Sequence, residues 1–217
     1  MNRVITVKGT GRVSSKPDLV VLSMALESQK LKYDETMELA TESLQELTAA
    51  IQSCGFKKED LKTTNFNIRT HYENYKDADN NYKNKFAGYI CEQGLKLEFD
   101  LDTKMLSKVL GVISETSVNP ILSINFSIKD SNAVGIELLE RATVNARQKA
   151  EILAKASGVT LGKILTIDYN WSELLFSSVT RFELQNQAMT SASRFVPDIE
   201  PEDIESSDTV TFVWEII

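Results

Sequence analysis

The sequence predicts an α+β fold: a largely antiparallel sheet, or sheets, with about three helices packed on one side, in two interlocked α/β subdomains. Several segments alternate apolar and polar residues with a period of two, which is typical of a strand with one face on a core and the other in water. Three longer segments repeat apolar residues at the helical spacing of three and four. Because the helices recur singly between groups of strands, a layer of helices against an antiparallel sheet is expected.

Two strands are expected at the amino terminus. A short apolar run at residues 5–7 and a longer one at residues 19–26 flank Gly9, Gly11 and the turn Lys16-Pro17-Asp18. We interpret the two glycines as a bend or bulge between the strands. A dinucleotide-binding loop is excluded, because its third glycine would fall at Ser14 and the segment leads into a strand instead of a helix.

The other strands follow from alternation along the chain. The clearest cases place four apolar residues on one face each, and two shorter runs show the same period. The alternating positions are Val20, Leu22, Met24 and Leu26; Leu95, Leu97, Phe99 and Leu101; Leu122, Ile124, Phe126 and Ile128; Val210, Phe212, Trp214 and Ile216; and, in the shorter runs, Phe66, Ile68 and Thr70, and Leu165, Ile167 and Tyr169.

Three helices are expected between these strands. The first follows an N-cap at Asp34 and closes at Gly55, and the second follows Asp102 or Thr103 and stops before Pro120. The third runs from about residue 131 to 157 and ends at Gly158. Its apolar stripe is rich in alanine, which allows it to lie close on a sheet: Leu139, Ala142, Ala146, Ala150 and Leu153.

One domain is expected over residues 1–217, divisible into a β-β-α-β-β half at 1–101 and an α-β-α-β-β half at 102–217. Residues 72–85 are interpreted as a hairpin tip that turns at residues 79–81. Residues 171–196 form a variable segment without sustained periodicity, which is long for a compact domain. Its apolar side chains are expected to dock on its own sheet or on a neighbouring subunit, and the candidate interface residues are Trp171, Leu175, Phe176, Phe182 and Phe195.

Charge and composition exclude some classes of protein. Six acidic residues between 198 and 208, without Lys or Arg among them, account for most of the net charge of −7. We interpret them as a solvated linker, because they lack the ligand spacing of a calcium-binding loop. The sequence has no stripe of basic residues, so nucleic-acid binding is not expected. No apolar run is long enough for a transmembrane helix. As given, the sequence has no signal peptide and predicts a cytoplasmic protein, or a periplasmic or secreted one if a leader was trimmed.

No catalytic, cofactor-binding or metal-ligating residues are predicted. The single histidine, His71, cannot supply a histidine-rich metal site, and no Gly-x-Ser-x-Gly elbow accompanies it. Cys54 and Cys91 do not form a Cys-x-x-Cys pair, and Cys54 is expected to be an inert, partly buried thiol. No cofactor is therefore expected, and the ligand, if any, is not identified.

Three blocks of sequence resemble one family. They are residues 6–11 with 16–18, residues 55–56 with 59–68, and residues 142–154 with 158–164; residues 86–89 and 209–212 fit as well. These blocks are similar to the SIMPL domain family, the family of YggE-like oxidative stress defence proteins and periplasmic immunogenic proteins. The resemblance implies a non-enzymatic α+β protein, often exported, some of whose relatives form ring-like or channel-like homo-oligomers. It supplies no catalytic residues, and residues 171–196 match none of its motifs.

The leading interpretation is therefore a non-enzymatic, self-assembling SIMPL protein of uncharacterised molecular function, linked to oxidative stress defence by resemblance. The alternative is a small-molecule or peptide binding module that uses a cleft between the two halves. An enzyme that relies on carboxylates alone also stays open. A homo-oligomer is the expected assembly.

Overall fold

The computed structural model describes residues 3–76, 80–170, 176–184 and 200–217, and the side chains of 181–184 lie outside that description. The fold is α+β, as predicted, with helices packed against antiparallel sheets. The chain forms two compact units, each with its own sheet. Unit 1 comprises Met1–Asp18, Ser127–Val179 and Pro201–Ile217, and unit 2 comprises Leu19–Phe126 and Thr180–Glu200.

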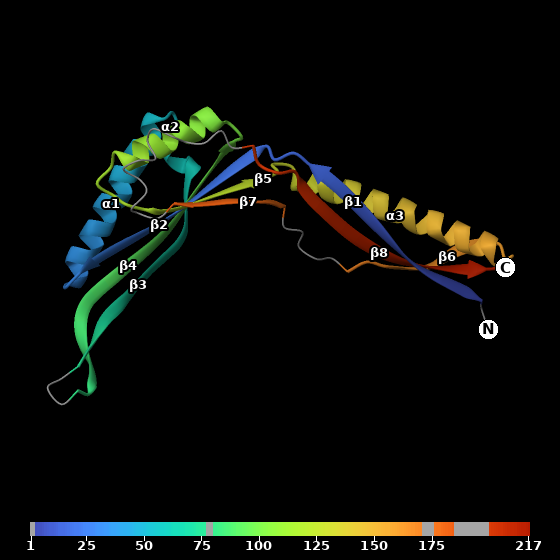
Figure 1. Cartoon of the computed structure of the whole chain (residues 1–217), viewed down its shortest axis with the longest axis horizontal. Helices are drawn as coiled ribbons and strands as arrows, with labels where there is room; N and C mark the ends of the chain where they lie inside the picture. The colour runs from blue at the N-terminus through green and yellow to red at the C-terminus, as the bar shows by residue number, and fades with distance from the viewer. Residues whose placement is uncertain (1–2, 77–79, 171–175, 185–199) are drawn as a thin grey trace. The chain divides into compact units, whose positions relative to one another are not determined.

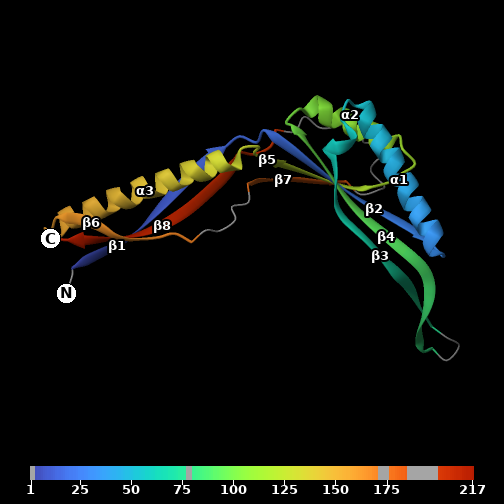
Figure 2. The same cartoon turned by 180° about the vertical axis from the view of Figure 1, so that it is seen from behind.

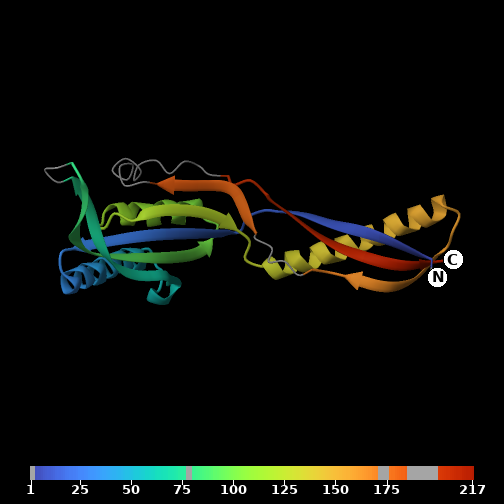
Figure 3. The same ribbon diagram turned by 90° about the horizontal axis from the view of Figure 1, so that it is seen from below.

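Unit 1 is a sheet with one long helix on one face. Its strands are β1 (Val4–Ser15), β8 (Ile204–Ile216) and β6 (Leu161–Asp168), in the order β1-β8-β6, and both pairings are antiparallel. Figure 3 shows β8 between the other two strands. The helix α3 (Ser131–Ala156) starts at Asp130, whose carboxylate accepts a hydrogen bond from the Ala133 N–H at 2.9 Å. It runs along β1 and β8 (Figures 1 and 2).

The contact between α3 and β1 is unusually close because both surfaces are made of small residues. Ala142, Ala146 and Ala150 are fully buried, as the alanine stripe predicted. Opposite them, a Cβ added to Gly9 would lie 2.6 Å from the Ala146 Cβ and would clash with the Ala142 carbonyl. A Cβ at Gly11 would clash with the Leu138 carbonyl in the same way.

The interpretation of these two glycines as a bend between strands was therefore wrong. Gly9 and Gly11 lie inside β1, where they pair in register with Val210 and Asp208 of β8. Glycine is needed at these positions because α3 approaches the backbone of β1 closely, and not because the chain turns there. The strand that follows, β2 (Leu19–Lys30), belongs to the other sheet.

Unit 2 is a larger sheet whose described strands are ordered β3-β4-β2-β5-β7. The remaining bounds are β3 (Leu61–Lys76), β4 (Tyr82–Asp100), β5 (Ile121–Ser127) and β7 (Ser177–Leu184). The helices α1 (Tyr33–Ser53) and α2 (Thr103–Ser114) cover one face, and a short 3₁₀ turn, η1 (Lys58–Asp60), precedes β3. The predicted alternating residues of β2, β4 and β5 form the core with both helices, including Leu22, Leu97, Ile124, Leu47 and Ile113.

The predicted helix ends are partly correct. Asp102 caps α2 by accepting hydrogen bonds from the N–H groups of Lys104 and Met105 at 2.8 and 3.2 Å. The first helix begins two residues earlier than predicted: its N-cap is Lys32, and Asp34 lies in the first turn. In α3 the buried stripe drifts toward Ala154, so Leu153 is 48% exposed instead of packed on the sheet.

Two segments predicted to lack regular structure contain strands. The variable segment holds β7, which lies beside β5 at the margin of the unit 2 sheet. The acidic linker ends earlier than expected because β8 starts at Ile204. Asp208, which was assigned to the solvated linker, is only 8% exposed and accepts a hydrogen bond from the Tyr169 hydroxyl at 2.9 Å.

The two units divide the chain differently from the predicted halves, 1–101 and 102–217. Each unit takes segments from both halves, because β1 pairs with β8 at the opposite end of the chain instead of with β2. The carboxyl-terminal strand therefore completes the sheet that the amino-terminal strand begins.

Replacing glycine by alanine is expected to have opposite effects on stability inside and outside the β1–α3 contact. Gly9→Ala is expected to lower the free energy of unfolding by about 1–3 kcal/mol, because the methyl group overpacks the contact. Gly111→Ala, in α2 where nothing lies within 4 Å of an added Cβ, is expected to raise it by about 0.5–1 kcal/mol. Urea denaturation of both variants measures the difference, and equal effects would contradict the assignment.

Candidate functional surfaces

The predicted interface residues are described only in part. Trp171, Leu175 and Phe195 lie outside the described residues, and Phe182 lies in β7 with its side chain outside them. Phe176 is half-buried, packs against the cluster of Val13, Val134 and Leu138, and its carbonyl accepts a hydrogen bond from the Ser127 hydroxyl at 2.6 Å. Phe176 therefore docks at least partly on unit 1, and the role of the set as an interface stays a prediction.

Chemistry-bearing side chains do not gather in the described part of the chain. No group of three or more His, Cys, Asp or Glu residues there could hold a metal ion. His71 lies at a bulge of β3, and Cys54 and Cys91 are buried as free thiols. Burial raises the pKa of the Cys91 thiol, which favours its unreactive, protonated form. None of the described helices combines the length and apolar character needed to cross a membrane.

The outer edge of β1 is closed by α3. The Asn145 side-chain oxygen accepts a hydrogen bond from the Thr10 N–H at 3.0 Å, and Arg141 and Lys149 donate to the carbonyls of Arg12 and Lys8 at 2.7 and 3.1 Å. Four residues of helix rise about 6 Å and two residues of strand about 6.7 Å, so the two spacings match. Side chains four apart on α3 therefore meet every second residue of β1.

The opposite edge of this sheet is apolar and exposed. Within the described residues β6 has a strand, β8, on one side only. Ile164, Leu165 and Ile167 are 48%, 38% and 58% exposed. A register shift at Leu165 sets Ile164 opposite Trp214 and Ile167 opposite Phe212, so both isoleucines share the face on which α3 packs. Such an edge can pair with another strand.

A groove lies between α1 and β3 in unit 2. It has a volume of about 420 Å³. Leu44, Leu61 and Leu95 supply apolar side chains, and Thr41 and Gln45 are among the uncharged polar residues of α1 that line it. The groove exists because α1 packs on β2 and β4 and leaves β3 uncovered, so that most of β3 is exposed.

A two-stranded arm extends beyond the unit 2 sheet. The strand β2 ends at Lys30, which lies opposite Tyr89, whereas β3 and β4 stay paired as far as Lys76 and Tyr82 (Figure 1). We call residues 72–76 and 82–86 the arm. This part of the chain was predicted as a hairpin tip, and the hairpin is confirmed, with paired strands over most of its length.

The arm leaves the sheet at a bulge that requires glycine. The register shifts between His71 and Tyr72, opposite Gly88. Gly88 has a φ of 123°, and a Cβ there would lie 2.9 Å from the carbonyl carbon of Lys30. The end of β2 thus packs directly on the backbone at the base of the arm.

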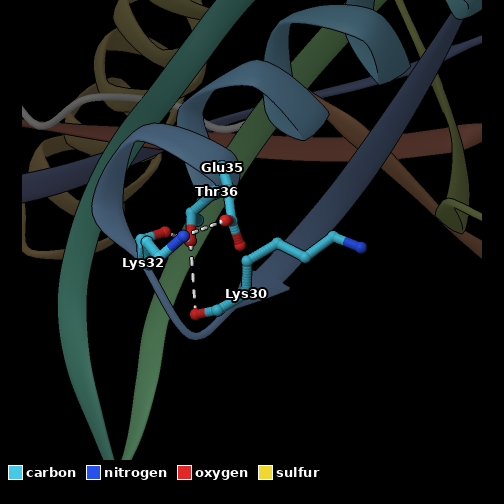
Figure 4. Close-up of polar contacts among 4 residues, drawn as sticks. All are labelled: Lys30, Lys32, Glu35 and Thr36. Atoms are coloured by element: carbon cyan, nitrogen blue, oxygen red, sulfur yellow. Dashed lines mark hydrogen bonds and ion pairs between the residues drawn. The ribbon is translucent and has the colours of Figure 1, made fainter.

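Thr36 ties the same base to the start of α1 (Figure 4). Its side chain is fully buried, and its hydroxyl donates to the Lys32 carbonyl at 2.9 Å, with longer contacts of 3.4 and 3.5 Å to the carbonyls of Lys30 and Tyr89. Beside it, the Lys32 ammonium lies 2.7 Å from the Glu35 carboxylate, whose hydrogen bond and charge raise the pKa of Lys32.

Aromatic rings continue this connection into the arm. Tyr33 contacts Tyr89 edge-on with ring centres 5.7 Å apart, Tyr89 contacts Phe86 at 5.5 Å, and Phe86 contacts Tyr72 at 5.7 Å. Edge-to-face pairs of this kind add about 0.5–1.5 kcal/mol each beyond area burial. The direction of the arm is therefore fixed by packing as well as by backbone pairing.

Sequence comparisons relate the chain to proteins without an assigned activity. The SIMPL family, described as a protein of unknown function (DUF541), matches residues 5–214. The 26 kDa periplasmic immunogenic protein of Brucella melitensis is 30% identical over 75% of this chain and 65% of its own length, and that of Brucella abortus is 29% identical over the same shares. The uncharacterized protein YggE of Edwardsiella ictaluri is 22% identical over 82% of this chain and 72% of its own length.

The Brucella relatives are therefore longer than the region they share with this chain. The chain spans about 65% of their length. None of these names describes an enzyme.

One carboxylate at the surface of unit 2 predicts a pH-dependent contribution to stability. Glu46 of α1 accepts hydrogen bonds from the N–H and the hydroxyl of Ser117, both at 2.6 Å, and these bonds lower its pKa from the ordinary 4.5. A carboxyl group with a lowered pKa in the fold stabilises it above the unfolded pKa, and this contribution is lost as the pH falls through the folded pKa.

Glu46→Gln is therefore expected to lower the free energy of unfolding at pH 7 and to change it much less near pH 3. Urea midpoints at both pH values test this. Glu42→Gln, on the same helix without a Ser117 contact, is the control and is expected to have little effect at either pH. An equal loss for Glu46→Gln at both pH values would contradict the role of the charge.

Proposed function

Because the chain belongs to the SIMPL family, we propose that it is a non-enzymatic protein that assembles with copies of itself. The observation that carries this proposal is the difference between the two edges of the unit 1 sheet. The edge of β1 is closed by hydrogen bonds from α3, whereas β6 carries exposed Ile164 and Ile167 and has a neighbouring strand on one side only among the described residues.

The physical reason is the cost of an open edge. A strand edge presents unpaired N–H and C=O groups, and proteins blunt such edges with charges, prolines or a covering element. The strand β6 contains one lysine and one aspartate, Lys163 and Asp168, and the residues between them are Ile164, Leu165, Thr166 and Ile167. Pairing with a second chain would bury these side chains and satisfy the backbone groups.

Location and physiological role are further proposals. The name of the Brucella relatives supports a periplasmic location for this chain, and cell fractionation would test it. A role in oxidative stress defence rests on the earlier resemblance alone, and peroxide survival of a deletion strain would test it.

A second candidate function is a binding module for small uncharged molecules, favoured by the groove between α1 and β3. Its apolar leucines and its polar rim, which is uncharged except for Lys58, suit a ligand with an apolar body and few polar groups. This groove lies within unit 2, whereas the alternative expected from the sequence was a cleft between the two halves.

Self-assembly predicts a specific response to charges placed on β6. Light scattering behind a sizing column should give a mass that is a multiple of 24.3 kDa for the unaltered chain. Ile164→Lys with Ile167→Lys should lower this mass, because two lysines on the edge oppose pairing. Ile136→Lys, at an isoleucine of α3 that is 60% exposed, is the matched control and should leave it unchanged.

Two results would contradict the proposal in different ways. A strict 24.3 kDa monomer at all concentrations would exclude self-assembly. An unchanged mass in the β6 variant would place the contact elsewhere.

The binding-module candidate predicts uptake of a neutral apolar probe. N-phenyl-1-naphthylamine should show increased fluorescence with the unaltered chain and a binding constant weakened about tenfold by Leu44→Gln, since a polar side chain enters the apolar part of the groove. Leu165→Gln, outside the groove, should have no effect. Equal fluorescence with both variants would exclude the groove as the site.

A further inference from the structure

We propose that β6 of one chain pairs antiparallel with β6 of a second copy, so that the two unit 1 sheets join into one continuous sheet about a two-fold axis. The proposal rests on self-assembly through the β6 edge. It adds to that edge the partner strand, the direction of pairing and the register in which the two strands meet.

The two edges of the unit 1 sheet exclude a head-to-tail arrangement. The described strands of this sheet end at β1 on one side and at β6 on the other (Figure 3). Adding β6 of one copy to β1 of the next would build an open row of sheets. The edge of β1 is occupied by α3, however, through its hydrogen bonds to Lys8, Thr10 and Arg12. Within this sheet, β6 is left to pair with an identical β6, and such an interface has two-fold symmetry.

This symmetry fixes the direction of the strands and the side on which the helices lie. A two-fold axis perpendicular to a sheet makes the two central strands antiparallel and puts α3 of both copies on the same face. Residues directly opposite each other in antiparallel strands project to the same face. Ile164 and Ile167 both lie on the α3 face, opposite Trp214 and Phe212 of β8. Isoleucine of one copy therefore meets isoleucine of the other on that face.

One register satisfies the apolar and the charged side chains together. When Ile164 of one copy lies opposite Ile167 of the other, all four isoleucines are neighbours at the centre of the joined sheet. Counting along β6 from this point, Lys163 of each copy then lies opposite Asp168 of the other. If an isoleucine lies opposite its own counterpart instead, either Ile164 or Ile167, neither pair of opposite charges forms.

The two charges are available for this contact. Lys163 and Asp168 are exposed, and they are the charged residues of β6. Among the described residues neither forms a salt bridge within the chain. Opposite charges directly across an antiparallel pair stabilise it, and like charges destabilise it. The sequence Lys-Ile-Leu-Thr-Ile-Asp is thus complementary to itself in the antiparallel direction, which favours a second β6 as the partner over an unrelated strand.

The bulge in β6 also favours an identical partner. Leu165 is the extra residue, because Ile164 lies opposite Trp214 and Thr166 lies opposite the adjacent Val213. In a regular strand, residues three positions apart point to opposite faces, and the bulge is what brings the two isoleucines to one face. A regular partner strand would match one isoleucine and miss the other. A second β6 has the same bulge, and in the proposed register Leu165 of each copy lies opposite Thr166 of the other.

A hollow on the α3 face adjoins this edge. It has a volume of about 420 Å³, and the residues that line it include Ile164, Phe212, Trp214 and, from α3, Thr143. It exists because α3 lies toward β1 and leaves the face of β6 uncovered. In the proposed register Ile167 of the second copy lies beside Ile164 on this face, where it adds apolar surface at the margin of the hollow.

Exchange of the two charges tests the register. Lys163→Glu alone places two carboxylates opposite each other at both ends of the contact, and Asp168→Lys alone places two ammonium groups there. Each single variant should weaken self-association about tenfold, measured by light scattering over a series of concentrations. An equimolar mixture of the two variants, or one chain with both substitutions, should recover the association of the unaltered chain, because a carboxylate again lies opposite an ammonium group at both ends.

Lys104→Glu and Glu42→Lys are the matched controls. Both residues are exposed in unit 2, and these substitutions change the net charge by the same amounts as the two β6 variants. Association should therefore be unchanged in both controls. Circular dichroism and the melting temperature of each β6 variant should match those of the unaltered chain, since the two substituted side chains are exposed and make no salt bridge among the described residues.

The outcomes separate this pairing from self-assembly itself. If the unaltered chain assembles and both single variants assemble equally well, or if the mixture and the double variant fail to recover while the variants stay folded, the pairing is wrong and self-assembly stands. An assembly with an odd number of chains would also overturn the pairing, because each chain has one β6 and the contact joins chains in twos. If the unaltered chain is a monomer at all concentrations, both proposals fail.

Discussion

The close approach of α3 to β1 is the constraint on which unit 1 depends. Ala142 and Ala146 meet Gly9 and Gly11, and a single methyl group on either glycine would strike the backbone of the helix. At this separation the side chains on the flank of α3 are near enough to reach the outer edge of β1. The hydrogen bonds of Arg141, Asn145 and Lys149 to the strand follow from that proximity, since longer side chains between the two elements would hold them apart.

The same constraint explains why β6 is open. Because α3 lies toward β1, its buried stripe covers that strand and β8, and the face of β6 is left with Ile164 and Ile167 exposed. Phe212 and Trp214, stacked with ring centres 5.2 Å apart, fill the space beneath the helix. The helix α3 therefore closes the β1 edge of the sheet and leaves the β6 edge available, so a further strand could be added at β6 only.

Local patterns predicted the elements whose signals are local. The alternation at Val20–Leu26 and Leu95–Phe99 and the cap at Asp102 depend on neighbouring residues, and the strands and the helix are where they were expected. The role of Gly9 and Gly11 depends on α3, more than 120 residues later in the sequence. A pair of glycines is compatible both with a bend and with a close helix contact, so the local sequence does not distinguish the two. The strand β7 was missed because its sequence lacks sustained alternation of apolar and polar residues. The start of β8 was missed because it contains acidic residues, and one of them, Asp208, is buried with a hydrogen bond from the Tyr169 hydroxyl.

The candidate surfaces were also predictable only where they depend on local sequence. The aromatic and lysine-rich composition of residues 72–85 is visible in the sequence, yet its interpretation as a tip missed that the strands pair through most of it. Pairing turns a set of scattered residues into two faces, with Glu73, Tyr75, Lys83 and Lys85 on one of them. In α1, Glu35, Glu38, Leu39 and Glu42 likewise form one surface, with Lys30 beside them, only because the helix places them on one side.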